Sequence, residues 1–196
     1  MAQTSTTLIS AKSHITSITG TDISLSATSG VYTISATSTV LTGAGKLAVG
    51  DLITVSGSAS NNSTFTVNTV VSTTELTVAE VVTSENADGS STITLDHVGF
   101  VSDKAKGDGY YSQPDGVHTV AYQVANDFNA DATIKMQGTL ATTPTEDDWF
   151  DIAGTTFTSD TSTLTSSFNF TGNYVWVRSK TQLLTAGTTN SILLNS

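Results

Sequence analysis

Apolar and polar residues alternate with a period of two in several short runs along the chain. The clearest runs lie at residues 52–56, 64–68, 76–78 and 92–95. Successive side chains of a β-strand point to opposite faces of its sheet, so this alternation predicts strands with one buried face. Connectors rich in glycine and asparagine separate the runs and predict turns. The spacing of the runs predicts an all-β protein built from a sandwich or small barrel.

The rest of the chain gives little sign of helix. At most one or two helical turns are expected near residues 145–148, where Pro144 precedes acidic residues that suit a helix N-terminus. Serine and threonine fill about a third of all positions, and charged residues only 12%. Threonine is β-branched and suits a pleated surface with one wet face, whereas exposed helices favour Glu, Lys, Ala and Leu.

A change in composition near residue 98 predicts two small β domains. Before it the chain is rich in Ser, Thr and Val, and after it the aromatic residues concentrate. We expect an N-terminal barrel-like domain over residues 1–97, with a three-stranded meander at 49–78 and two or three more strands within 23–42. A C-terminal antiparallel β-sandwich is expected over 98–196. Residues 101–109 are polar and glycine-containing, which predicts a linker or long loop between the two.

The strands expected in the C-terminal domain predict different degrees of burial for its two tryptophans. Strands are expected at 131–140, at 148–152, in two pieces within 168–178, and at 188–194. Trp176 alternates with Val175 and Val177, which predicts a strand buried on both faces. We expect Trp176 to lie in the core beside Phe168 or Phe170, and Trp149 to be the more exposed tryptophan.

Charge limits the classes of partner. The net charge is −10, and no Lys or Arg lies between Lys46 and Lys104. Nucleic acid and anionic membranes are therefore not expected as ligands, because phosphate contacts need clustered basic residues. The chain has no cysteine, no run of about 20 apolar residues and no basic or apolar region of an export signal at residues 1–8. These features predict assembly in a reducing cytoplasm.

Catalytic and cofactor motifs are missing from the sequence, so we predict a non-enzymatic protein without a cofactor. The histidines His14, His97 and His118 stand outside any metal-binding spacing, and they are expected to be solvated in turns. One acidic cluster offers carboxylates for calcium, although without the spacing of a calcium loop; its candidate ligands are Asp147, Asp148 and Asp151. Capping of a helical turn is the alternative interpretation of that cluster, and no metal is predicted.

Exposed aromatic residues are the remaining candidates for contact with a partner. Tyr110 and Tyr111 stand side by side between Gly109 and a turn-forming segment, and Trp149 follows three acidic residues. Aromatic side chains in loops contact sugars and protein partners. Packing of one tyrosine against the domain is the other interpretation, and the sequence leaves both open.

Two segments resemble structural proteins of tailed bacteriophages. Residues 50–67 contain Gly-Asp-Leu-Ile-Thr-Val-Ser-Gly-Ser followed by Asn and Phe-Thr-Val, a pattern similar to one in many such proteins. Asp148-Trp-Phe-Asp, together with residues 170–178, is similar to virion proteins of large marine and cyanobacterial phages. The resemblances cover about residues 40–80 and 117–194. They imply a virion location and self-assembly, and they transfer no catalytic residue.

The leading hypothesis is therefore a virion structural component that decorates the capsid or forms part of the neck, tail or fibre. We expect it to assemble in the host cytoplasm as a closed homo-oligomer, with a trimer as the first expectation for its size, and to contact other virion proteins. The alternative is a module that binds host-surface glycans through Tyr110, Tyr111 or Trp149. A bacterial adhesin or surface-layer domain is a third option. The sequence leaves open the position on the particle and the copy number.

Overall fold

The computed structural model describes residues 5–111, 116–159 and 164–195. Of these described residues, 52% lie in strands and 4% in helical turns, so the predicted all-β fold class is confirmed. Every pairing between the strands described below is antiparallel. The chain divides into two compact units, one formed by residues 15–100 and the other by residues 1–14 together with 101–196. We call them the 15–100 unit and the 101–196 unit.

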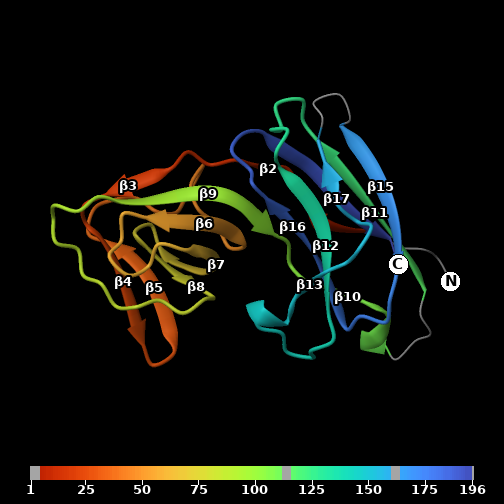
Figure 1. Cartoon of the computed structure of the whole chain (residues 1–196), viewed down its shortest axis with the longest axis horizontal. Helices are drawn as coiled ribbons and strands as arrows, with labels where there is room; N and C mark the ends of the chain where they lie inside the picture. The colour runs from red at the N-terminus through yellow and green to blue at the C-terminus, as the bar shows by residue number, and fades with distance from the viewer. Residues whose placement is uncertain (1–4, 112–115, 160–163, 196) are drawn as a thin grey trace. The chain divides into compact units, whose positions relative to one another are not determined.

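The 15–100 unit is one antiparallel sheet in the order β3-β9-β6-β7-β8-β5-β4 (Figure 1). Its strands are β3 (Ile18–Gly20), β4 (Ile23–Thr28), β5 (Val31–Ala36), β6 (Asp51–Ser56), β7 (Thr64–Ser72), β8 (Glu75–Val78) and β9 (Ile93–Val101). The meander predicted within 49–78 is confirmed as β6, β7 and β8. The strands predicted within 23–42 are confirmed as the β4–β5 hairpin.

This sheet contains two bulges in β7, one of its two nine-residue strands. The first residues of β7 pair with β6, and the rest pair with β8 past two bulges. Bulges bend a strand and increase its twist. The sheet encloses a mostly aliphatic core, which includes Ile18, Ile23, Leu25, Ile34, Leu41, Leu47, Ile53, Val55, Phe65, Val67, Leu76, Val78, Val82, Ile93 and Leu95. Closure into a barrel stays a prediction.

The 101–196 unit contains two sheets (Figure 1). The first has the order β1-β17-β11-β15, with β1 (Ser5–Ile9), β17 (Thr188–Asn195), β11 (Val117–Val124), β15 (Thr165–Thr171) and the short β2 (Lys12–Ser13) on β17. The second has the order β13-β12-β16, with β13 (Phe150–Asp151), β12 (Thr133–Thr139), β16 (Trp176–Gln182), β14 (Phe157–Thr158) on β12 and β10 (Ala105–Lys106) on β16.

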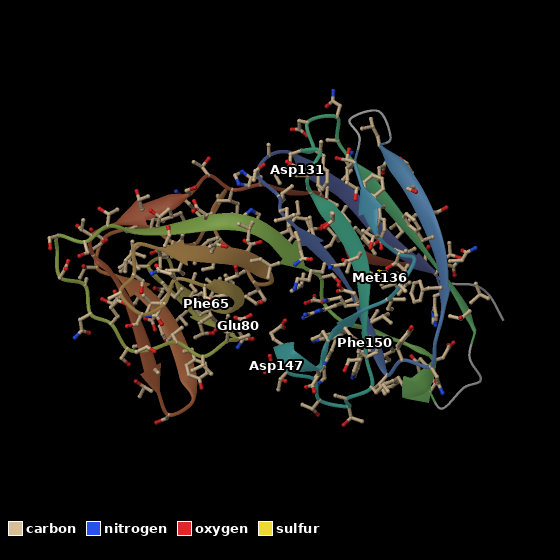
Figure 2. All side chains as sticks on the ribbon, in the orientation of Figure 1. Phe65, Glu80, Asp131, Met136, Asp147 and Phe150 are labelled. Atoms are coloured by element: carbon tan, nitrogen blue, oxygen red, sulfur yellow. The ribbon has the colours of Figure 1, made fainter. Side chains whose placement is uncertain are left out.

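The inner faces of these two sheets share a core. Tyr122 of β11 donates its hydroxyl to the carbonyl of Thr155 at 2.9 Å, and its ring centroid lies 6.1 Å from that of Phe157 on β14. Burial of the Tyr122 hydroxyl raises its pKa well above the usual value of 10.0. Met136 on β12 is fully buried (Figure 2). This arrangement is sandwich-like, as the sequence predicted.

The N-terminal residues lie in a different unit from the predicted one. We assigned residues 1–97 to the first domain, but β1 and β2 pair with β17 at the other end of the chain, as in Ser5 opposite Asn195. Such pairing depends on tertiary contact between segments nearly the whole chain apart, which local patterns do not encode. The later division, between Phe100 and Val101, lies three residues from the predicted one.

Residues 101–109 do not form the expected linker or long loop. The Ser102 amide donates to the carbonyl of Ser179 at 3.0 Å, and β10 pairs with β16. A 3₁₀ turn, η1 (Asp108–Tyr111), follows directly. The segment is therefore an integral part of the 101–196 unit.

The expected core position of Trp176 is wrong. Trp176 is half-buried, and its indole Nε1 donates to the carbonyl of Thr142 at 3.0 Å. β16 begins at this residue, which pairs with Lys106 of β10 and Thr139 of β12. The Trp176 ring lies against the exposed residues Tyr110 and Lys104 and not in the core. Val177, Ser179 and Thr181 on one face of the strand are buried, whereas on the other face only Arg178 is buried and Trp176, Lys180 and Gln182 are half-buried.

The segment before β13 contains the predicted helical turn. The 3₁₀ turn η2 (Glu146–Asp148) follows Pro144, and this prediction is confirmed. Trp149 after it is half-buried, and Phe150 is 45% exposed (Figure 2). Both tryptophans are thus half-buried, and the greater exposure of Trp149 stays a prediction. Within the described residues, no helix has the length and apolarity to cross a membrane.

Candidate functional site

Two predicted contact residues, Tyr110 and Tyr111, belong to a cluster of aromatic rings and lysines. The centroid of the Tyr110 ring lies 5.1 Å from that of Tyr111 and 4.8 Å from that of Trp176. Lys106 Nζ lies 4.2 Å from the Tyr110 centroid and 5.5 Å from that of Tyr111. Lys104 Nζ lies 4.5 Å from the Trp176 centroid. We call these five residues the aromatic–lysine cluster.

Two glycines hold the tyrosines in this position. The amides of Gly107 and Gly109 donate to the carbonyls of Val175 and Tyr174 at 3.0 and 2.8 Å. A Cβ at Gly107 would lie 2.4 Å from the Tyr174 carbonyl oxygen, which no side chain can occupy without moving backbone. The absence of side chains therefore lets η1 lie directly against the backbone that leads into β16. The tyrosines and Trp176 meet because of this close approach.

The cluster is open to solvent. Tyr110 is 43% exposed and Tyr111 is 55% exposed, and both lysines are exposed. Cations above aromatic faces are attracted by the ring quadrupole, so each ammonium group is held near a ring while it keeps contact with water. The arrangement can contact an external molecule through ring faces and two positive charges at once.

Trp149 contacts a different group. The guanidinium carbon of Arg178 lies 4.2 Å from the Trp149 ring centroid. Arg178 itself is buried, and it donates two hydrogen bonds to Glu146, at 2.8 and 2.7 Å, and one to Gln137 at 3.0 Å. This bidentate ion pair joins η2 to β16 and β12. The ring contacts of Trp149 are thus structural, and Trp176 is the tryptophan that joins the tyrosine pair.

The three candidate calcium ligands are not brought together. Asp148 accepts hydrogen bonds from the amide and the hydroxyl of Thr145, which lower its pKa. Burial raises the pKa of Asp151, but hydrogen bonds from Lys135 and Gln137 outweigh it and lower the pKa. Asp147 is exposed on η2. No group of three or more potential metal-ligating His, Cys, Asp or Glu side chains occurs in the part of the chain that the structure describes.

The expectation that His97 and His118 are solvated is wrong, because each is buried beside an aspartate. In the 15–100 unit, His97 Nε2 lies 3.4 Å from Asp51 Oδ1, and His97 Nδ1 accepts a hydrogen bond from the Ile15 amide at 3.3 Å. In the 101–196 unit, His118 Nε2 lies 3.3 Å from Asp108 Oδ2.

These pairs belong to the interior. His97 and His118 are 2% and 1% exposed, and their rings stack on Phe100 and Phe170 with centroids 6.4 and 5.0 Å apart. A general acid or base must come within hydrogen-bond reach of its substrate, which an enclosed imidazole cannot do. The alternation in β11 and β9 places both histidines on the inward face, and this signal was present in the sequence.

A cavity of about 350 Å³ lies in the 15–100 unit beside the loop after β6. Its lining includes Glu85 and Asp88. Hydrogen bonds from the Ser58 hydroxyl and the Ala59 amide lower the pKa of Glu85, although burial opposes this. The hydroxyl and amide of Ser91 likewise lower the pKa of Asp88. Both carboxylates hold loop backbone, so they are structural anchors.

The sheet that contains β11 has an outer face without charge. Register and alternation place thirteen residues there, none of them Asp, Glu, Lys or Arg: Ser5, Thr7, Val117, Thr119, Ala121, Gln123, Thr165, Ser167, Asn169, Thr171, Ser191, Leu193 and Asn195. Val117 is 63% exposed and Leu193 37%. Thr119 donates across the strands to Asn169 at 2.8 Å. We call this surface the uncharged sheet face.

The aromatic–lysine cluster and the uncharged sheet face are the two surface features of the 101–196 unit that suit contact with another molecule. Sequence reasoning found the tyrosine pair but missed Lys104, Lys106 and Trp176. The alternation of Lys104 and Lys106 before Gly-Asp-Gly-Tyr-Tyr was the available signal. No family model matches the chain, and comparison with curated proteins finds no match.

Proposed function

We propose that this chain is a non-enzymatic structural component of a phage virion that assembles as a homo-oligomer through the uncharged sheet face. The observation that carries the proposal is the lack of any charge on thirteen outward residues of four neighbouring strands. In a chain of net charge −10, most contacts between two copies bring like charges together. Copies that meet through this face avoid that repulsion.

The chemistry of the face also suits contact between sheets. Exposed Val117 and Leu193 supply apolar area, and hydroxyl and amide side chains supply hydrogen bonds without the desolvation cost of ions. The edge strand β15 adds unpaired backbone groups beside it. A trimer is the first expectation for the closed oligomer.

The virion location rests on the sequence resemblance of residues 50–67 and 148–178 to phage structural proteins. The lack of a catalytic role is supported by the burial of His97 and His118, which keeps the strongest candidates for acid–base chemistry away from solvent. Capsid, neck, tail and fibre positions all agree with these observations.

Sedimentation velocity tests the assembly. Val117→Glu and Leu193→Glu place a negative charge on the face, and we expect either change to dissociate the oligomer. Val71→Glu is the matched control, since Val71 is 56% exposed on β7 of the other unit. A wild-type chain that is monomeric at all concentrations, or charged variants that assemble normally, would contradict the proposed interface. Mass spectrometry of purified particles tests the virion location, which fails if the chain is absent from them.

A further inference from the structure

We infer that the aromatic–lysine cluster binds a sugar that carries a carboxylate, with the ring faces against the sugar ring and a lysine against its acid group. This role goes beyond structural assembly and does not depend on it, because none of the five cluster residues is among the thirteen of the uncharged sheet face.

The first argument is the exposure of fixed aromatic rings. Tyr110 and Tyr111 are 43% and 55% exposed, whereas Tyr122 and Phe128 of the same unit are buried in its core. The Gly107 and Gly109 contacts with backbone hold η1, and the indole hydrogen bond to Thr142 holds Trp176. Rings fixed in this way lose little conformational freedom when they bind a partner. The C–H face of a pyranose ring is apolar and flat enough to stack on such rings.

The second argument is the position of the lysines. Lys46 is the single Lys or Arg of the 15–100 unit, whereas Lys104 and Lys106 stand two residues apart in this cluster. Within the described residues, both ammonium groups contact ring faces and neither forms an ion pair. Each is therefore available to an external carboxylate. By contrast, Lys135 and Arg178 already pair with acidic residues.

The third argument concerns the number of negative charges on the ligand. Two acidic residues belong to the same segment: Asp103 is exposed, and Asp108 is turned to His118 and to the amide of Gly116. With a net charge of −10, the protein repels a polyanion such as nucleic acid, which needs many basic contacts. An isolated carboxylate needs only one lysine. The cluster thus suits a small saccharide that carries one carboxylate.

Titration with soluble saccharides tests the proposal on the full chain. Sialyllactose and glucuronic acid are the acidic probes, and lactose and glucose are the neutral ones. We expect saturable binding of an acidic probe at millimolar concentration, seen as shifts of the Tyr110, Tyr111 and Trp176 ring signals in NMR spectra. Tyr111→Ala and Lys106→Gln should each weaken it about tenfold, the scale of one lost stacking or charged contact.

Matched variants separate the cluster from general effects. Phe150→Ala removes another exposed aromatic ring of the same unit, and Lys46→Gln removes a positive charge in the other unit. Both should bind as the wild type does. No binding of either acidic probe at millimolar concentration would overturn the proposal, as would equal binding of the neutral probes or equal loss in the control variants. None of these results would bear on assembly through the uncharged sheet face.

Discussion

The two units use their carboxylates in different ways. In the 15–100 unit, Asp22, Glu85 and Asp88 accept hydrogen bonds from loop amides and hydroxyls, and Glu80 accepts them from Thr66 of β7. In the 101–196 unit, cations supply a second kind of partner. Arg178 pairs with Glu146 and Lys135 pairs with Asp151. The cause is the distribution of basic residues, one in the first unit and six in the second.

The difference shows which hydrogen-bond donors fix the loops of a β protein that has few basic residues. Seven acidic residues against one lysine leave the 15–100 unit with a net charge of −6, so its carboxylates must find neutral donors. Short loops rich in serine and threonine supply these donors as backbone N–H and side-chain O–H groups. In the 101–196 unit, basic residues both join the strands and extend to the surface, where Lys104 and Lys106 meet exposed rings.

The largest expected effect tests whether the two units are independent. Ile34 and Met136 are both fully buried, one in each unit. Ile34→Ala and Met136→Ala should each lower the free energy of unfolding of their own unit by about 2–5 kcal/mol, because each leaves a cavity in a packed core. In scanning calorimetry, each variant should shift one of two transitions. A single transition that both changes shift equally would show that the units unfold as one.

Removal of Arg178 should have the next largest effect. Arg178→Ala leaves Glu146 and Gln137 without their partner and uncovers Trp149, so we expect a loss of about 2–3 kcal/mol in urea unfolding. The control is Lys135→Ala, whose partner Asp151 is 50% exposed; its loss should stay below about 1 kcal/mol. Equal losses in the two variants would contradict the structural role of the buried ion pair.

The carboxylate anchors predict an acid response in the 15–100 unit. The hydroxyl of Ser58, then the amide of Ala59, lower the pKa of Glu85 below its usual value of 4.5. A group whose pKa is lower in the folded state stabilises the fold above its unfolded pKa, and this stabilisation is lost as pH falls through the folded pKa. Glu85→Gln should therefore lose less stability than the wild type between about pH 5 and about pH 3. If the free energy of unfolding changed with pH in the same way in both proteins, Glu85 would not stabilise the loop through its charged form.

The smallest effect is expected at the aromatic–lysine cluster. Tyr111 is 55% exposed, so Tyr111→Ala should change the free energy of unfolding by no more than about 0.5 kcal/mol. Thermal unfolding of the variant checks this. A large loss of stability would mean that the ring supports the fold, and that its exposure is not kept for a ligand.

Several elements followed from local pattern. Alternation predicted the meander of β6, β7 and β8, the strand β12 and the final strand β17, and Pro144 with its acidic neighbours predicted η2. These features depend on residues close in sequence, whose preferences act before any long-range contact forms. The tyrosine pair was identified in the same way, from its place beside Gly109.

Other features depend on contacts between distant segments. The pairing of β1 with β17, the burial of His97 and His118 beside Asp51 and Asp108, and the half-exposed place of Trp176 all do so. The alternation of apolar and polar residues predicted which residues share a face of a strand. It did not predict which other element covers that face, nor the residue at which the strand begins. Local pattern therefore identified the tyrosine pair but did not show that Trp176 joins it and the two lysines in the aromatic–lysine cluster.

The sequence by itself determined the all-β class, the positions of most strands and the shift of aromatic and basic residues toward the C-terminal half, because periodicity and composition are local properties of the chain. The tertiary structure decided which strands become neighbours. Paired strands can lie far apart in the sequence, and the residues within one strand do not indicate which distant strand it pairs with. The tertiary structure thereby placed Lys106 opposite Trp176 and removed the carboxylates of Asp148 and Asp151 from any shared metal site.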